Sequence, residues 1–281
     1  MGVPVTATFT VTTLVVLAVL GFAVGAFGTV VGAGGGFILT PVLLILYPGD
    51  PASTITAISL VVVFFNALSG SAAYARQRRI DYRSGIVFAL CTLPGAIGGT
   101  LLVQFASRRL FDAITAIVLG ALAVWIMVAR EADARTAIAG GGSIRHLVDR
   151  DGNSYTYSVR VMRGALLSLG VGFVSSFLGI GGGVIHVPLM VGFLGFPVHV
   201  ATATSHFVLA VMSGASSLVH VLLGSFSIGH GLRRSVALSL GVVFGAQLGA
   251  LASRHIGGRR IRQLLAVGLL VLAARLAIAV L

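Results

Sequence analysis

Long stretches without any charged residue constrain this chain more than any other feature. Residues 1–49, 51–75, 84–107 and 164–232 contain no Asp, Glu, Lys or Arg. A helix that crosses the hydrocarbon core of a bilayer needs about 20 apolar residues, so the last stretch alone is long enough to cross about three times. The stretches are continuously apolar and do not alternate, which excludes a transmembrane β-barrel. The sequence therefore predicts an all-α polytopic membrane protein.

The charge and cysteine content narrow the class further. Charged residues make up 9% of the 281 residues, against about a quarter in a typical soluble domain, which disfavours a soluble enzyme or a disordered chain. The net charge of +12 is carried by arginines in short loops, where the positive-inside rule explains them without nucleic-acid binding. The single Cys91 rules out an internal disulfide and a multi-cysteine metal site. No metal or cofactor is expected.

The apolar stretches divide into ten predicted helical segments. The one long polar stretch, residues 130–163, contains the glycine run 140–142 and has the composition of a flexible connector. The chain therefore divides into a first transmembrane repeat (1–130), a polar cytoplasmic connector (131–160) and a second transmembrane repeat (161–281). The ten segments are 10–31, 35–47, 53–75, 84–105, 110–129, 161–179, 183–196, 200–223, 235–253 and 262–281.

Three motifs of the first repeat recur in the second in the same order. Residues 32–41, Gly-Ala-Gly-Gly-Gly-Phe-Ile-Leu-Thr-Pro, match residues 179–188, Gly-Ile-Gly-Gly-Gly-Val-Ile-His-Val-Pro, at an offset of 147. Downstream, residues 56–59 match residues 202–205 at an offset of 146, and 95–99 resemble 245–249. Conserved order and spacing indicate an internal duplication. The short segments that follow the two glycine clusters are too short to span a bilayer alone.

Arginine counts predict that the two repeats have inverted topology. If each glycine-linked pair makes two short passes, each repeat of about five segments crosses five times and the second repeat begins on the opposite side. The loops 76–83, 130–163 and 254–262 then lie on one side with 14 arginines, against four in the loops on the other side. A single crossing by each pair gives only 12 against 6. The positive-inside rule therefore favours inverted repeats.

Triple glycine within a membrane segment predicts a helix break that binds an anion. A short helix that begins just after the break directs free N–H groups and its positive dipole end at whatever lies there. Two such ends, related by an inverted repeat, would meet near the membrane midplane, where transporters place substrates. Substrate binding is therefore assigned to Gly34, Gly35, Gly36, Gly181, Gly182 and Gly183, with Pro41 and Pro188 as structural helix breaks. The alternative is close helix packing, which we expect for scattered glycines such as Gly21, Gly25, Gly164, Gly170 and Gly172.

Neutral polar side chains after each break complete the candidate site. Hydroxyl and amide donors bind an oxyanion and still let it leave, although Ser and Thr in membrane helices also bond to their own backbone. His186 lies between the second glycine cluster and Pro188 and is a candidate for carrying a coupling proton. The alternative for His186 is a neutral ring bonded to a backbone carbonyl. The other candidates are Thr56, Ser59 and Asn66 in the first repeat and Thr204, Ser205 and His206 in the second.

These motifs resemble the sulfite exporter TauE/SafE family, also called toluene-sulfonate uptake permeases. The resemblance covers nearly the whole chain apart from the connector, although Ile58 stands where a Thr commonly precedes the Ser. It implies a multi-pass permease of a bacterial inner membrane that carries sulfite, a sulfonate or a related organosulfur anion.

The sequence thus predicts a secondary transporter, a permease or exporter, that binds a small anion at the midplane and exposes it to each side in turn. Its partners are the anion, with or without H⁺ or another coupling ion, and the lipid bilayer, and the pattern is compatible with an oligomer. An anion channel using the same site is the alternative. An enzyme is not expected, because all seven acidic residues lie in or beside loops and none is placed for catalysis.

Overall fold

The computed structural model describes residues 11–128, 142–226 and 230–253, together with 255–257, 260, 263, 266–271 and 273–274. Nine helices in this part of the chain correspond to the first nine predicted segments. The last predicted segment, 262–281, lies mostly outside the described residues, and its described stretch 266–271 is helical. The helices are α1 (Val11–Val31), α2 (Gly36–Leu46), α3 (Ala52–Arg76), α4 (Tyr82–Leu102), α5 (Arg108–Val128), α7 (Val161–Leu178), α8 (Gly183–Gly192), α9 (Val198–Leu222) and α10 (His230–Ala252), with a short 3-10 helix η1 (Val103–Phe105) after α4.

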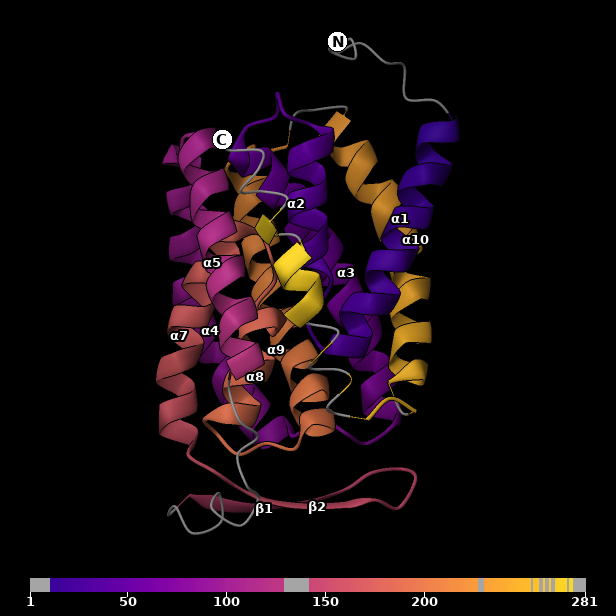
Figure 1. Ribbon diagram of the computed structural model, residues 1–281, viewed down its shortest axis with the longest axis vertical. Coiled ribbons are helices and arrows are strands. Elements are labelled where there is room, and N and C mark those ends of the chain that lie inside the picture. Colours follow the sequence, from indigo (N-terminus) through magenta and orange to yellow (C-terminus); the bar gives the residue numbers. More distant parts are fainter. Residues whose placement is uncertain are drawn as a thin grey trace.

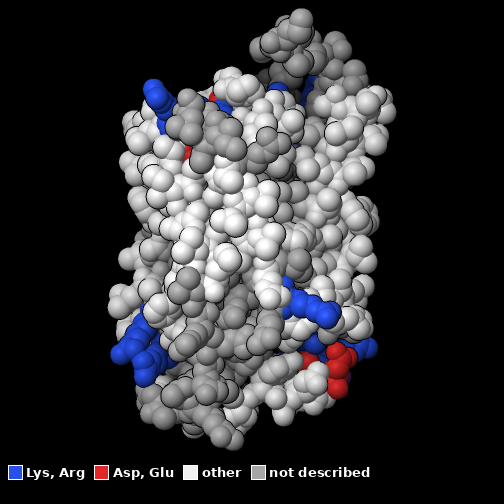
Figure 2. All heavy atoms as spheres, viewed as in Figure 1, with Lys and Arg blue, Asp and Glu red and all other residues white. Residues whose placement is uncertain are grey.

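The helices form an upright bundle with an apolar outer surface. Within the described residues, six helices are long and apolar enough to cross a membrane, namely α1, α3, α4 with η1, α7, α9 and α10. The charged side chains visible in Figure 2 lie toward the two ends of the molecule and leave an uncharged band between them. This distribution is what a bilayer requires of a protein that spans it. The structure is mostly helical, so the prediction of an all-α polytopic membrane protein is confirmed outside the hairpin described below.

Helices of each half of the chain pack against helices of the other half. Helix α1 packs on α10 of the other half, where Gly21 and Gly25 face the backbone of Leu238 and Val242. Helix α7 packs on α4 in the same way. Because residue numbers rise together along each pair, α1 and α10 run in the same direction, and so do α4 and α7. Helices α3 and α9 pack against each other and against the partner helices α10 and α4.

Four of the five scattered glycines lie in such contacts, as expected. Gly164 faces the Phe88 ring and Gly172 the main chain of Thr92. The prediction is wrong for Gly170, which is exposed and has open space where a side chain would lie. Gly170 lies on the outer face of α7, so its lack of a side chain brings no other helix closer.

A β-hairpin replaces most of the flexible connector expected between the halves, so the all-α prediction and the flexible-connector prediction are both wrong for residues 143–159. Strand β1 (Ser143–Val148) pairs antiparallel with β2 (Ser154–Val159), in register from Ser143 opposite Val159 to Val148 opposite Ser154. Tyr155, Tyr157 and Val159 alternate with small polar residues, which is the period of a strand. Residues 149–153, whose composition is typical of a linker, form the turn, where Asp149 accepts hydrogen bonds from the main-chain N–H groups of Asp151 and Asn153 at 2.9 Å each.

The hairpin is fixed to the loop between α3 and α4. Arg79 lies 3.3 Å from the Asp149 carboxylate, and both side chains are buried. The main-chain N–H of Arg150 donates to the Gln77 carbonyl, and the Tyr157 hydroxyl donates to Asp81, each at 3.0 Å. Burial and the neighbouring Asp81 carboxylate raise the pKa of Tyr157, so its hydroxyl stays a donor.

Hydrogen bonds between loops define the two ends of the bundle. At the hairpin end, the Gln77 amide donates to the Ala250 carbonyl at 3.1 Å, which brings the end of α10 there. At the other end, Arg108 donates to the carbonyl of Asp50 at 2.8 Å and Arg234 to its carboxylate at 2.6 Å. Figure 1 shows the first turn of α1 at this second end and the first turn of α7 beside the hairpin.

Candidate functional site

Both predicted helix breaks are present. Helix α1 ends at Val31 and α2 begins at Gly36, while α7 ends at Leu178 and α8 begins at Gly183. The breaks need glycine because the backbone turns through left-handed conformations, with φ of 78° at Gly35 and 70° at Gly181. The prediction that triple glycine interrupts a helix at each place is therefore confirmed.

The two prolines do not make the breaks. Pro41 and Pro188 lie inside α2 and α8, each at the sixth position of its helix. The assignment of these residues as helix breaks is therefore corrected. A proline at this position removes one helical hydrogen bond and leaves the carbonyl four residues earlier without its N–H partner. The interruption itself follows from the glycines that precede the helix.

The two breaks touch each other in the core. A Cβ at Gly36 would lie 2.6 Å from the Ile180 carbonyl oxygen, and a Cβ at Gly183 would lie 2.7 Å from the Cα of Ala33. Because Gly36 and Gly183 are equivalent in the two repeats, these contacts are reciprocal. The glycines thus allow the starts of α2 and α8 to approach at backbone distance.

The hydroxyls of Ser59 and Ser205 donate hydrogen bonds to the helix ends that precede the breaks. Ser59 donates to the Gly179 carbonyl at 2.6 Å, and the equivalent Ser205 donates to the Gly32 carbonyl at 3.4 Å. Thr40 also lies within hydrogen-bonding distance, 2.7 Å, of the Gly179 carbonyl. Each serine therefore satisfies an orphan carbonyl of the opposite repeat, and its proton is committed to that bond in this conformation.

Asn66 directs an unpaired amide at the start of α2. Its Oδ1 accepts a hydrogen bond from the Thr29 hydroxyl at 2.7 Å, so its Nδ2 points away from Thr29. Nδ2 has no hydrogen-bond partner although the side chain is fully buried. A Cβ at Gly35, the residue before α2, would lie 3.3 Å from this nitrogen. Two free N–H donors therefore lie at the positive end of a helix dipole.

The second break is lined differently. Met212 is the equivalent of Asn66 at the repeat offset of 146, and a Cβ at Gly182 would lie 3.3 Å from both its Sδ and its Cε. A thioether offers no hydrogen-bond donor. The donor arrangement at Gly35 is therefore not repeated at Gly182, even though the backbone breaks correspond.

His206 is buried on the other side of Thr29. A Cβ at Gly70, one turn after Asn66 on α3, would lie 3.1 Å from His206 Nε2 and 3.2 Å from Thr29 Cγ2. Nδ1 of the same ring lies 3.3 Å from the Thr202 carbonyl, while Nε2 has no partner. Asn66 and His206 are thus brought together around Thr29, a residue that the sequence analysis did not select.

The remaining predicted residues lie away from this cluster. Thr204 accepts a hydrogen bond from the main-chain N–H of Asp81 at 3.0 Å, at the hairpin end. Thr56 donates to the Ser53 carbonyl at 3.0 Å, and its backbone lies against Gly179. His186 Nε2 lies 2.9 Å from the Ser168 hydroxyl, and its ring packs near Phe88.

A second buried polar cluster, not singled out from the sequence, joins α3, η1 and α9 at the end opposite the hairpin. The Gln104 amide donates to the Ser225 hydroxyl, which lies 3.0 Å from His220 Nδ1. Thr54 donates to the Ser225 carbonyl at 2.9 Å. The polar side chains of this cluster have partners, so it does not offer the free donors found at Asn66.

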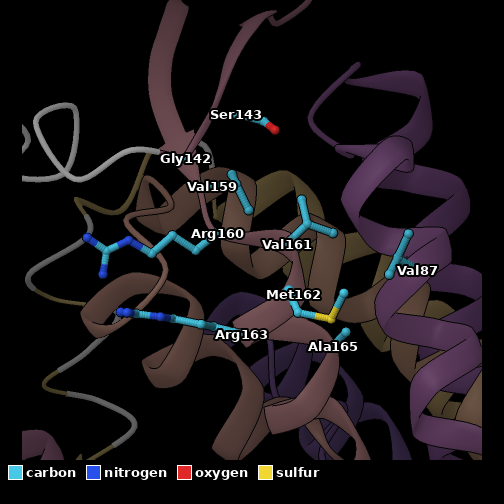
Figure 3. Close-up of a pocket in the computed structure, with 9 residues that line it drawn as sticks. All are labelled: Val87, Gly142, Ser143, Val159, Arg160, Val161, Met162, Arg163 and Ala165. Atoms are coloured by element: carbon cyan, nitrogen blue, oxygen red, sulfur yellow. The ribbon is translucent and has the colours of Figure 1, made fainter.

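One surface cavity of about 640 Å³ lies at the root of the hairpin, remote from the breaks. Figure 3 shows the side chains of Arg160 and Arg163 directed away from Val87, Val161 and Met162, which form its apolar side. None of the predicted substrate-binding residues lines it. The candidate site is therefore the buried cluster around Asn66.

Comparison with known proteins assigns the chain to a family. Residues 17–276 match the family model described as sulfite exporter TauE/SafE. The chain belongs to the TauE/SafE family. The match covers both repeats and confirms the resemblance inferred from the duplicated glycine motifs.

Relatives of this TauE/SafE protein are named as transporters. It is 31% identical over 274 residues to the probable membrane transporter protein YunE of Bacillus subtilis, and the alignment covers 93% of this chain and 96% of the relative. A probable membrane transporter protein of Methanocaldococcus jannaschii is 24% identical, covering 90% of this chain and 91% of the relative. One from Haemophilus influenzae is 25% identical, covering 85% and 83%. No solved structure matches this chain.

The family and its spans agree on location and class. A TauE/SafE protein with six candidate spans among its described residues is a multi-pass integral membrane protein, as expected, and the Bacillus relative agrees with a bacterial plasma membrane. The family and these relatives are described as membrane transporters and not as enzymes.

Proposed function

We propose that this TauE/SafE protein is a secondary transporter of a small anion, which it binds at the start of α2. One observation supports this proposal above the others: the buried, unpartnered amide nitrogen of Asn66 lies against Gly35. A buried donor without a partner is costly for a folded protein, typically about 1–3 kcal/mol. A ligand that accepts its hydrogen bonds would recover that cost.

The chemistry of the proposed site favours an anion held without a formal positive charge. Asn66 supplies two N–H donors, and the first main-chain N–H groups of α2, at Gly36 and Phe37, lack intrahelical acceptors because they begin the helix. The helix dipole adds a partial positive charge at the same point. Within the described residues no Lys or Arg side chain contacts Asn66. A neutral set of donors binds an anion reversibly, which a transporter needs.

The proposed cargo is sulfite, a sulfonate or a related organosulfur anion. What supports it is membership of a family described as sulfite exporters. The site chemistry agrees, because the several oxygens of such an anion can accept from Asn66 and from the start of α2 at once.

We further propose that alternating access uses two inverted repeats, residues 1–130 and 161–281. Support comes from the parallel pairing of α1 with α10 and of α7 with α4, and from the first turns of α1 and α7 lying at opposite ends of the bundle. Rocking of one repeat against the other about the two breaks would expose Asn66 to each side in turn. In the present conformation Asn66, Ser59 and Ser205 are fully buried, as an occluded substrate site requires.

The test is uptake of sulfite into proteoliposomes that contain the purified protein. Asn66→Leu removes the amide at similar volume, and Met212→Leu is the matched control at the equivalent position of the second repeat. We expect Asn66→Leu to lower the uptake rate at limiting sulfite about 10- to 100-fold, since a hydrogen bond to a charged group contributes about 1.5–3 kcal/mol. Met212→Leu should keep at least half of the wild-type rate.

Two results would overturn the proposal. An equal loss of uptake in both variants, when size-exclusion chromatography shows that both proteins are folded, would mean that the anion does not bind specifically at the first break. Single-channel recordings with discrete unitary currents would replace the carrier with the anion channel that uses the same residues.

A further inference from the structure

His206 presents a buried acceptor that anion binding alone does not require. Its Nδ1 lies 3.3 Å from the Thr202 carbonyl oxygen. Because a carbonyl only accepts hydrogen bonds, Nδ1 carries the ring proton and Nε2 presents a lone pair. This Nε2 has no hydrogen-bond partner, and the side chain is fully buried. His206 Nε2 is therefore an unpaired buried acceptor, of the opposite character to the unpaired donor Asn66 Nδ2.

The acceptor and the donors lie on adjacent turns beside Thr29. His206 Nε2 lies against Gly70, which follows Asn66 by one helical turn on α3. At a rise of 1.5 Å per residue, the two positions are about 6 Å apart along the helix. Thr29 contacts both, because its hydroxyl donates to Asn66 and its methyl group lies near Gly70. Only a glycine at position 70 leaves Nε2 uncovered on the α3 side.

The surroundings of the imidazole contain no charge that would otherwise fix its protonation. From α3, Tyr74 faces the ring edge-on at 5.5 Å, and its hydroxyl donates to the Thr29 carbonyl. Helix α1 carries no titratable residue between its ends. On α8, His186 hydrogen-bonds to Ser168. Asp81, which precedes α4, contacts α9 through its main-chain N–H, which donates to the Thr204 hydroxyl. Helix α7 carries Arg163 near its start, at the hairpin end. Within the described residues, neither ring nitrogen of His206 hydrogen-bonds to a charged side chain.

We infer that the site binds its anion together with one proton, which lies between His206 Nε2 and an oxygen of the anion. The inference rests on the proposed function and deepens it. Asn66 donates to one oxygen, and a second oxygen that bears a hydrogen donates to Nε2. The ligand class is a singly charged oxyanion that keeps an acidic hydroxyl, such as hydrogensulfite. No covalent bond changes, and the proton enters and leaves with the anion.

Charge and donor matching explain this preference. A fully deprotonated dianion would place an oxygen lone pair against the lone pair of Nε2, which disfavours it in a buried site. An alkanesulfonate has no hydroxyl, so it would need the proton on His206 instead. Both cases move one proton with each anion. We infer this role for His206 and not for His186, because His186, whose Nδ1 also lacks a partner, lies beside Ser168 and Phe88 and away from Asn66.

The experiment measures proton and anion uptake together. Proteoliposomes with a pH-sensitive dye in the lumen receive sulfite or methanesulfonate at pH 6 and pH 8, with protein-free liposomes as the baseline. We expect the dye to report one proton released per anion for methanesulfonate, and one per anion for sulfite at pH 8, where hydrogensulfite loses its proton inside the vesicle. We expect methanesulfonate uptake at pH 8 to be at least tenfold slower than at pH 6. His206→Phe keeps the ring shape without Nε2 and should lower sulfite uptake at pH 6 at least tenfold, whereas His186→Phe should keep the wild-type profile.

The outcomes separate this inference from the proposed function. Anion uptake that depends on Asn66 but carries no proton, or a His206→Phe profile equal to that of wild type, would overturn the inference alone. Absence of any anion uptake by folded wild-type protein would overturn the proposed function. If His206→Phe does not fold, the wild-type ratio of protons to anions decides the matter without it.

Discussion

Asn66 and Met212 occupy equivalent positions and face equivalent glycines, yet one is a hydrogen-bond donor and the other is not. Nδ2 of Asn66 would lie 3.3 Å from a Cβ at Gly35, and Sδ of Met212 would lie the same distance from a Cβ at Gly182. The duplicated backbone therefore provides two breaks, while the side chains provide donors at only one. This asymmetry points to a single anion site at the first break.

The two glycines should respond differently to substitution. Gly35 has a φ of 78°, and a Cβ there would lie 2.9 Å from the Val24 carbonyl oxygen, whereas Gly182 has a φ of −64° and meets only side chains, the nearest being that of Met212. We expect Gly35→Ala to lower the free energy of unfolding by about 1–3 kcal/mol, since a left-handed backbone strains any residue with a side chain. Gly182→Ala should change it by less than about 1 kcal/mol. Thermal unfolding in detergent measures both, and equal shifts would contradict the different backbone conformations of the two glycines.

The packing of α1 against α10, which joins the two halves of the chain, depends on small residues in both helices. A Cβ at Gly241 would overlap the main chain of Ala18, because the two helices touch at backbone distance. We expect Gly241→Ala to destabilise the protein by about 1–3 kcal/mol through overpacking. Gly170→Ala is the control, since that helical glycine faces open space and alanine favours a helix. A lower unfolding temperature for Gly170→Ala than for Gly241→Ala would show that the packing is different.

The topology is testable with single cysteines. In a Cys91→Ala background, Gly49→Cys and Ser154→Cys place an exposed thiol at opposite ends of the bundle, in the α2–α3 loop and on β2. The arginine distribution predicts that the hairpin lies in the cytosol. We expect a membrane-impermeant maleimide to label Gly49→Cys in intact cells, and Ser154→Cys only after permeabilisation. Labelling of both thiols in intact cells would contradict the arrangement.

Docking of the hairpin should weaken in acid. Burial by itself raises the pKa of Asp149, but hydrogen bonds from Asn153 and the charge of Arg79 outweigh it and hold the pKa below that of an ordinary Asp. The ion pair therefore stabilises the docked hairpin above the ordinary pKa, about 3.9, and this contribution is lost as the pH falls through the lower value of the folded state.

Amide hydrogen exchange of residues 143–159 measures this effect once the intrinsic pH dependence is removed. Asp149→Asn should raise exchange at pH 7 at least tenfold, because Arg79 is left buried without its nearest carboxylate. Asp151→Asn should have a smaller effect, because that side chain is 45% exposed and 3.8 Å from Arg79. Equal effects of the two substitutions would show that the buried pair of Arg79 and Asp149 is not what holds the hairpin in place.

Much of the scaffold follows from the sequence because membrane helices leave strong local signals. Apolar runs and loop arginines place the helices, and the two triple glycines mark both breaks. Composition alone does not predict the hairpin, because the polar turn, residues 149–153, masks the alternating pattern of residues 154–159. Arg108 and Arg234 gain their roles only from folding, since both bind Asp50, which is distant from each in the chain.

The candidate site is predictable from the sequence only in part. Asn66 and His206 stand out as polar residues within membrane segments, but Thr29, which orients Asn66, carries no signal of its own. Ser59 and Ser205 match across the repeats because each supports a carbonyl of the opposite repeat, and their recurrence therefore does not distinguish a structural role from substrate binding. Comparing the two repeats position by position would reveal the Asn66–Met212 asymmetry.

The central claim is that one anion binds at the start of α2, and anomalous diffraction from crystals grown with selenite tests it most directly. Selenite resembles sulfite in shape and charge, and selenium can be located by its anomalous signal. We expect a peak within hydrogen-bonding distance of Asn66 Nδ2, beside Gly35. A peak beside Gly182 and Met212 instead, or no peak at either break in a protein that transports selenite, would contradict the account.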